Sequence, residues 1–110
     1  MDERTDERIE KIVTILDKHK GEDIRVFDFR DSEYFVDIVI IVTGLGDRHL
    51  DALLNYLKKG LKPQETFLNV EVSDNWIVID LGDILIHIMT SEYRELYNLE
   101  EILDEVANRC

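Results

Sequence analysis

The chain has 110 residues, of which 45% are hydrophobic and 35% charged, so it is long enough for one domain with a modest core. Its formal net charge of −12 disfavours direct contact with nucleic-acid backbones or anionic membranes. A basic protein partner would be attracted instead, although the charge alone favours simple solubility as its explanation. A single cysteine, Cys110, provides no disulfide framework, and the charged N-terminus does not resemble a signal peptide, so we expect a cytoplasmic protein.

The first half of the chain predicts a helix, two strands and a second helix. Apolar residues at helical spacing indicate a helix over about Thr5 to Lys20. Weak alternation indicates a strand over Ile24 to Arg30, and the branched run from Asp37 to Thr43 predicts a strand covered on both faces. Asp47 is expected to cap a helix with a leucine stripe. The stripe consists of Leu50, Leu53, Leu54, Leu57 and Leu61.

The second half predicts about three strands followed by a helical end. Thr66 to Val72 indicate one strand, and a hairpin follows. At the C-terminal end, Asn98 is expected to end one helical piece and to cap the next, with Glu101 as its capping-box partner. The tail, residues 104–110, has no assigned role. This order predicts one α/β domain over residues 1–110, with a mixed sheet of about five strands flanked by helices.

The hairpin at Asp74 to Thr90 has a two-residue turn, which places Leu81 opposite Ile84 and thereby fixes both faces. One face is wholly apolar and is predicted to belong to the core. The other face is mixed, and we expect it to be partly open for binding, because a dry core tolerates an aspartate and a histidine poorly. Its residues are Trp76, Val78, Asp80, Leu85, His87 and Met89, with Trp76 opposite Met89.

Other patterns suggest chemistry, but each has a simpler structural interpretation. The loop from Thr43 to His49 lies where phosphate loops occur, yet it lacks both GxGxxG and a Walker lysine, so a turn with a cap is favoured. Asp80 and His87 lie diagonally on the hairpin and could form half of a general-base arrangement, although a structural role is favoured. Two carboxylate pairs lack the spacing of a magnesium site: Asp80 with Asp83, and Asp28 with Asp37. We therefore expect no catalytic residue, no metal and no cofactor.

The segment DNWIVIDLGDILIHIM, followed by SEYRELYNLEEIL, closely resembles the ribosomal silencing factor family, also called Iojap-like. The resemblance extends from about Gly21 to Leu103. The matching residues are Trp76, Asp80 to Asp83, His87, Glu92, Arg94, Tyr97, Leu99 and Glu100, and upstream Asp37, Thr43-Gly44 and Arg48-His49. The chain departs from the family pattern at Gly46-Asp47, Val72 and Leu103, which affects local turns rather than membership.

The resemblance implies a nucleotidyltransferase-related fold without catalytic carboxylates. It also implies binding to the large ribosomal subunit through large-subunit protein fourteen, which blocks joining of the small subunit and represses translation; organelle relatives act in large-subunit assembly. The mixed hairpin face would then supply apolar contacts from Trp76, Val78, Leu85 and Met89 and polar contacts from Asp80 and His87. For Arg94 and Tyr97 a structural role is favoured over ribosome contact: Arg94 is expected to pair with a nearby carboxylate and Tyr97 to close the end of the core.

Two alternatives remain open at this point. One is a small nucleotide-handling enzyme that uses the Gly44 to His49 loop. The other is a homodimerisation module in which the mixed face pairs with itself across a two-fold axis.

Overall fold

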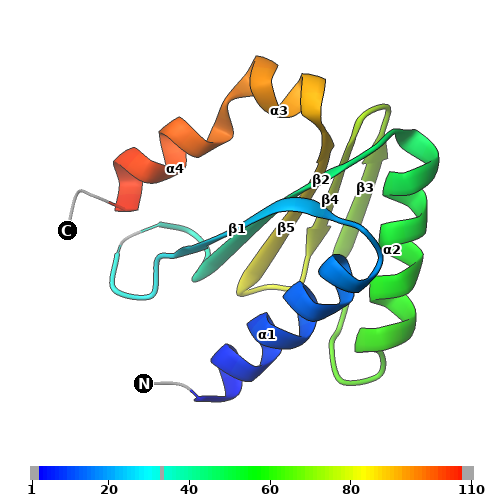
Figure 1. Cartoon of the computed structure of the whole chain (residues 1–110). Helices are drawn as coiled ribbons and strands as arrows, with labels where there is room; N and C mark the ends of the chain where they lie inside the picture. The colour runs from blue at the N-terminus through cyan, green and yellow to red at the C-terminus, as the bar shows by residue number, and fades with distance from the viewer. Residues whose placement is uncertain (1–2, 33, 108–110) are drawn as a thin grey trace.

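The computed structural model describes residues 3–32 and 34–107 and shows a five-stranded sheet between two layers of helices (Figure 1). Helices α1 and α2 cover one face, and α3 and α4 lie over part of the other (Figure 1). In chain order the elements are α1 (Glu3–Lys18), β1 (Glu22–Asp28), β2 (Ile38–Gly44), α2 (Asp47–Leu61), β3 (Asn69–Ser73), β4 (Trp76–Asp80), β5 (Ile84–Thr90), α3 (Ser91–Tyr97) and α4 (Leu99–Ala107).

The sheet is mixed, as predicted, with the strand order β1-β2-β5-β4-β3. Only the pairing of β2 with β5 is parallel; the other three strand pairs are antiparallel. All seven residues of β2 are buried. This confirms that the branched run forms a strand covered on both faces, as expected for a parallel-paired strand inside a sheet.

The first face of the sheet carries the main core. All five predicted leucines of α2 are buried there, together with Ile12 and Leu16 of α1. The predicted cap of α2 is wrong, because Gly46 occupies the N-cap position and Asp47 is the first helical residue. The Asp47 carboxylate instead accepts a hydrogen bond of 2.6 Å from the backbone N–H of Asn75, in the turn before β4.

The hairpin of β4 and β5 has the predicted register. Trp76 pairs with Met89, and the Leu81 N–H donates to the Ile84 carbonyl at 2.9 Å across the turn. Gly82 has a φ of 100°, in the left-handed region that favours glycine. The side chains of the predicted apolar face all belong to the core of the first face: Ile77, Ile79, Leu81, Ile84, Ile86 and Ile88.

The C-terminal region forms two helices, as predicted. Asn98 ends α3 in a left-handed conformation with φ of 44°, and its side-chain amide donates to Glu101 at 2.6 Å. The two expected partners therefore meet, although through their side chains rather than through the backbone N–H groups of a capping box. The predicted tail begins inside α4, which continues to Ala107, whereas Cys110 lies outside the described residues.

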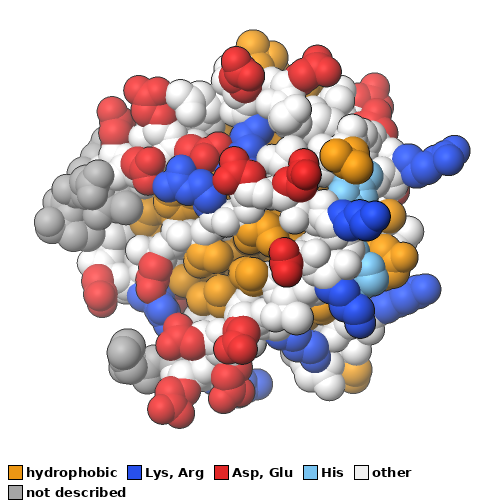
Figure 2. Space-filling model, viewed as in Figure 1, with side chains coloured by type: hydrophobic (Ala, Val, Ile, Leu, Met, Phe, Trp, Pro, Cys, Tyr) orange, Lys and Arg blue, Asp and Glu red, His pale blue; other side chains and the backbone are white. Residues whose placement is uncertain are grey.

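Charge is unevenly distributed over the surface. Figure 2 shows Asp and Glu side chains spread over much of this view, with several Lys and Arg side chains among them. At the right of the view, over α2 and the end of α1, Lys, Arg and His side chains gather instead. The net charge of −12 is thus a sum over regions of different sign.

Candidate docking surface

The second face of the sheet is only partly covered. Helix α4 packs on β1, and α3 packs on β2 and β5. The part of this face formed by β4 and the neighbouring positions of β5 stays partly exposed. We call this surface the Trp76 face. Its residues are Trp76, Val78, Asp80, Leu85 and His87 of the hairpin, together with Tyr97 of α3.

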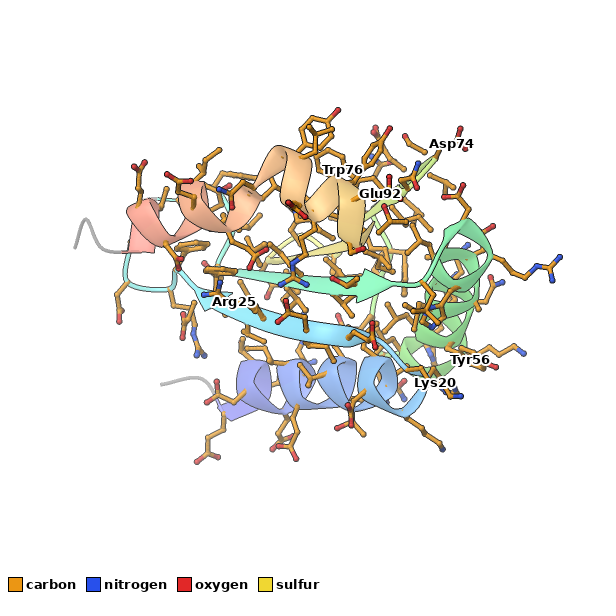
Figure 3. The ribbon with its side chains drawn as sticks, turned by 45° about the horizontal axis from the view of Figure 1, so that its top comes forward. Lys20, Arg25, Tyr56, Asp74, Trp76 and Glu92 are labelled. Atoms are coloured by element: carbon orange, nitrogen blue, oxygen red, sulfur yellow. The ribbon has the colours of Figure 1, made fainter. Side chains whose placement is uncertain are left out.

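Trp76 is held in place by contacts from two sides. Its indole Nε1–H donates to Nδ1 of His87 at 3.1 Å, and the Tyr97 ring lies 5.1 Å away between centroids. Tyr97 in turn lies 5.5 Å from the ring of Tyr93. Figure 3 shows Trp76 beside α3, in agreement with these distances. The tryptophan is therefore oriented before any partner arrives, which lowers the entropy lost on binding.

One predicted contact residue does not lie on this surface. Met89 is fully buried in the second core cluster, because Trp76 and Tyr93 pack against that cluster from outside. The expectation that Met89 offers an open contact is therefore wrong for the chain as folded. The register that places Met89 opposite Trp76 is nevertheless confirmed.

Helix α3 adds apolar surface that sequence reasoning missed. Tyr97, expected to close the end of the core, is 48% exposed, and the adjacent Leu96 is 70% exposed. The sequence did contain an indication of this exposed surface: Leu96 and Tyr97 are adjacent at the end of a short helix, and neither belongs to an apolar stripe that would be buried. Arg94 is buried, which confirms its favoured structural role.

Asp80 and His87 do not form the diagonal pair considered from the sequence. The Asp80 carboxylate accepts from the backbone N–H of Gly82 at 2.8 Å, within the hairpin turn. His87 accepts from Trp76 instead. The aspartate therefore stabilises the turn and the histidine orients the indole, which gives neither residue the geometry of a general base.

Acidification is expected to destabilise the fold through His87. Burial lowers the pKa of His87 from 6.5 to about 4, so the unfolded chain takes up this proton first. The stability contributed by neutral His87 is complete above pH 6.5 and is lost as the pH falls toward 4. Between pH 7 and pH 5 we expect urea denaturation to show a loss on the order of 2 kcal/mol. His87→Asn, whose side-chain oxygen can still accept from Trp76, should abolish most of this loss; an unchanged loss would contradict the assignment.

Acidic residues border the Trp76 face. Glu71 lies on the same side of the sheet as its pairing partner Val78, and it is exposed. Asp74 in the turn before β4 and Glu92 at the start of α3 are also exposed. An apolar strip with an acidic border is complementary to an apolar patch on a basic protein.

At the other candidate sites, the polar side chains bond to groups of the protein itself. In the Gly44 to His49 loop, Nδ1 of His49 accepts from the Leu45 N–H at 2.9 Å, and Asp47 binds Asn75. Asp83 forms an ion pair with Arg8, at 2.7 Å. Across residues 3–32 and 34–107, no three metal-ligating side chains form a group that would hold an ion, and no helix there has the length and apolar character needed to cross a membrane.

Comparisons with known proteins agree with the resemblance. The model of the family described as "Ribosomal silencing factor during starvation" matches residues 2–109. The ribosomal silencing factor of Haemophilus influenzae is 37% identical over 97 residues, which cover 86% of this chain and 95% of that protein. Mouse mitochondrial assembly of ribosomal large subunit protein 1 is 31% identical over 100 residues; these cover 86% of this chain but 44% of the mouse protein.

Solved structures show the same fold. A crystal structure from Chromobacterium violaceum has a TM-score of 0.83 and 26% identity, covering 90% of this chain and 85% of that one. One from Bacillus halodurans has a TM-score of 0.75 and 27% identity, covering 88% and 93%. Because the family model spans nearly the whole sequence and the expected fold is confirmed, this chain belongs to the ribosomal silencing factor family.

Proposed function

We propose that this protein binds the large ribosomal subunit through the Trp76 face and thereby prevents the small subunit from joining. The observation that carries the proposal is the half-open sheet face, with an oriented tryptophan beside an exposed tyrosine and an acidic border. Relatives named for ribosome silencing and for large-subunit assembly support the choice of partner. The family resemblance points further to large-subunit protein fourteen as the contacted protein.

The mechanism is steric rather than chemical. Occupying a surface that the small subunit needs requires shape and affinity but no reacting group. Trp76 and Tyr97 provide aromatic anchors of the kind that dominate interface energies, and Val78 and Leu85 extend the apolar contact. The same contact would serve large-subunit assembly, because a bound factor keeps an immature subunit out of translation.

Subunit joining provides the direct test. Purified large subunits are incubated with excess protein, small subunits are added, and light scattering follows formation of the joined particle. We expect a smaller scattering rise with the protein than without it, and co-sedimentation of the protein with the large subunit alone. An undiminished rise, despite saturated binding, would contradict the steric mechanism.

If the protein does not bind the large subunit, the two alternatives, a nucleotide-handling enzyme and a homodimerisation module, are tested next. Titration with nucleotides and magnesium tests an enzyme that uses the Gly44 to His49 loop. Sedimentation equilibrium tests a homodimer formed through the Trp76 face. A dimer that dissociates when large subunits are added would still agree with the proposal, since one face would serve both partners in turn.

A further inference from the structure

Basic side chains gather where the end of α1 meets α2. Figure 2 shows this gathering, and Figure 3 shows Lys20 and Tyr56 at the same junction. Few Asp and Glu side chains lie among these cations in that view, although Asp17, Asp47 and Asp51 are their neighbours along the chain. We call this surface the basic patch. Its residues are Lys18, His19, Lys20, Arg48, Tyr56 and Lys59.

The junction beneath the basic patch is fixed by contacts of two histidines. The His19 ring stacks on Tyr56 with centroids 3.4 Å apart and planes within 5°. His49 lies 2.9 Å from the His19 carbonyl through its Nε2 and accepts from the Leu45 N–H through its Nδ1. The segment that carries Lys18 and Lys20 is therefore held against α2, so the cations of both helices present one surface.

The cations of the basic patch differ from the arginines elsewhere in their pairing. Arg8, Arg25 and Arg94 all form ion pairs with carboxylates. In the part of the chain that the structure describes, none of the patch cations has a carboxylate within 4.0 Å. They are exposed, so their charges are available to an anionic partner.

The basic patch adjoins the Trp76 face at one edge. Asp47, the first residue of α2, binds the N–H of Asn75, which directly precedes Trp76. Arg48 follows Asp47 in the first turn of α2. A partner that contacts Trp76 can therefore extend over the same edge toward the patch cations.

We propose that the basic patch contacts phosphate groups of ribosomal RNA beside the protein that the Trp76 face binds. This inference rests on the proposed function, because a ribosomal partner places a polyanion next to the docked protein. The net charge of the whole chain predicts no contact with nucleic acid. Binding to phosphates, however, is driven by the lysines and arginines at the contact itself, because they release the counterions condensed on the nucleic acid. Acidic side chains elsewhere on the surface would oppose an RNA backbone, so an RNA contact at the basic patch restricts the orientation of docking.

Two patch variants and one matched control test the inference. Lys20→Glu and, separately, Arg48→Glu reverse a patch charge, while Lys11→Glu makes the same change of net charge two turns before Lys18 on α1. Affinity for purified large subunits is measured at several potassium concentrations, after equal melting temperatures have been verified. Each patch variant should bind about tenfold more weakly at moderate salt and lower the slope of log affinity against log salt by about 1, whereas the control should match wild type.

The outcomes separate this inference from the proposed function. Retained binding with equal slopes in all variants would overturn the RNA contact and leave the docking proposal standing. Absence of wild-type binding would overturn both. Vesicles of phosphatidylglycerol provide a third arm: wild-type binding that Lys20→Glu abolishes, with subunit affinity unchanged, would assign the patch to lipid phosphate and overturn the RNA contact.

Discussion

Trp76→Ala is expected to weaken binding to the large ribosomal subunit at least thirtyfold, equivalent to about 2 kcal/mol. Aromatic anchors at the centre of an interface carry most of its energy, and Trp76 is already oriented by His87 and Tyr97. The measurement is co-sedimentation with purified large subunits over a range of protein concentrations. Truncation also removes indole packing from above Met89, so the free energy of unfolding must be measured on the same variant.

Phe35→Ala provides the matched control for the loss of an aromatic side chain. Phe35 is 72% exposed and precedes β2, at the end of the sheet where Ile38 pairs with Ile84. Trp76 lies at the other end, beside Met89. We expect the control to bind like wild type. Equal affinities of wild type and a folded Trp76→Ala would show that the partner binds elsewhere.

The hairpin shows what pattern reasoning can predict about this fold. A two-residue turn permits one pairing, and side chains in a strand alternate between faces, so all of its residues could be assigned to a face. The leucine stripe of α2 was equally predictable, because five apolar residues at helical spacing leave one face to bury. These features depend on local geometry alone.

The extent of cover on the mixed face could not be predicted in the same way. It depends on where α3 and α4 lie, which is set by the left-handed conformation of Asn98 and by contacts between distant segments. For this reason Met89 was expected to be open and is buried, whereas Tyr97 was expected to be buried and is exposed. Alternation assigns a residue to a face but does not say whether another element covers it.

Polar partners were the least predictable part of the site. Proximity on the hairpin suggested an Asp80–His87 pair, yet each of these side chains accepts a hydrogen bond from a different donor. The Gly82 N–H of the tight turn lies two residues from Asp80, and the indole N–H requires an acceptor once Trp76 is partly buried. Such choices depend on side-chain rotamers, which the sequence pattern does not specify.

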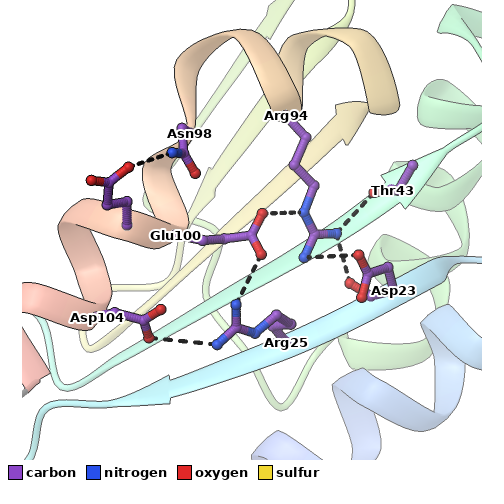
Figure 4. Close-up of polar contacts among 8 residues, drawn as sticks. Asp23, Arg25, Thr43, Arg94, Asn98, Glu100 and Asp104 are labelled. Carbon is purple, nitrogen blue, oxygen red and sulfur yellow. Dashed lines mark hydrogen bonds and ion pairs between the residues drawn. The ribbon is translucent and has the colours of Figure 1, made fainter.

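The position of α3, and with it that of Tyr97, depends on a buried arginine. Arg94 donates through Nη1 to the Asp23 carbonyl at 2.6 Å and to the Thr43 hydroxyl at 2.8 Å (Figure 4). Its Nε donates to Glu100 of α4 at 2.7 Å, and this hydrogen bond lowers the pKa of the Glu100 carboxyl. One guanidinium therefore joins β1, β2, α3 and α4.

Arg94→Met is expected to lower the free energy of unfolding by about 3 kcal/mol, because it leaves partly buried acceptors without their donor. Arg25→Met is the matched control, since Arg25 binds the same carboxylate at 3.0 Å but is 42% exposed, and a surface pair contributes less than about 1 kcal/mol. Urea denaturation at pH 7 measures both.

A folded Arg94→Met should also bind large subunits less tightly, because α3 then no longer holds Tyr97 against Trp76. Methionine keeps an apolar side chain in the buried position and removes only the guanidinium. Equal losses of stability in the two variants would therefore show that packing at position 94, rather than the hydrogen bonds and ion pairs of Arg94, fixes the position of α3.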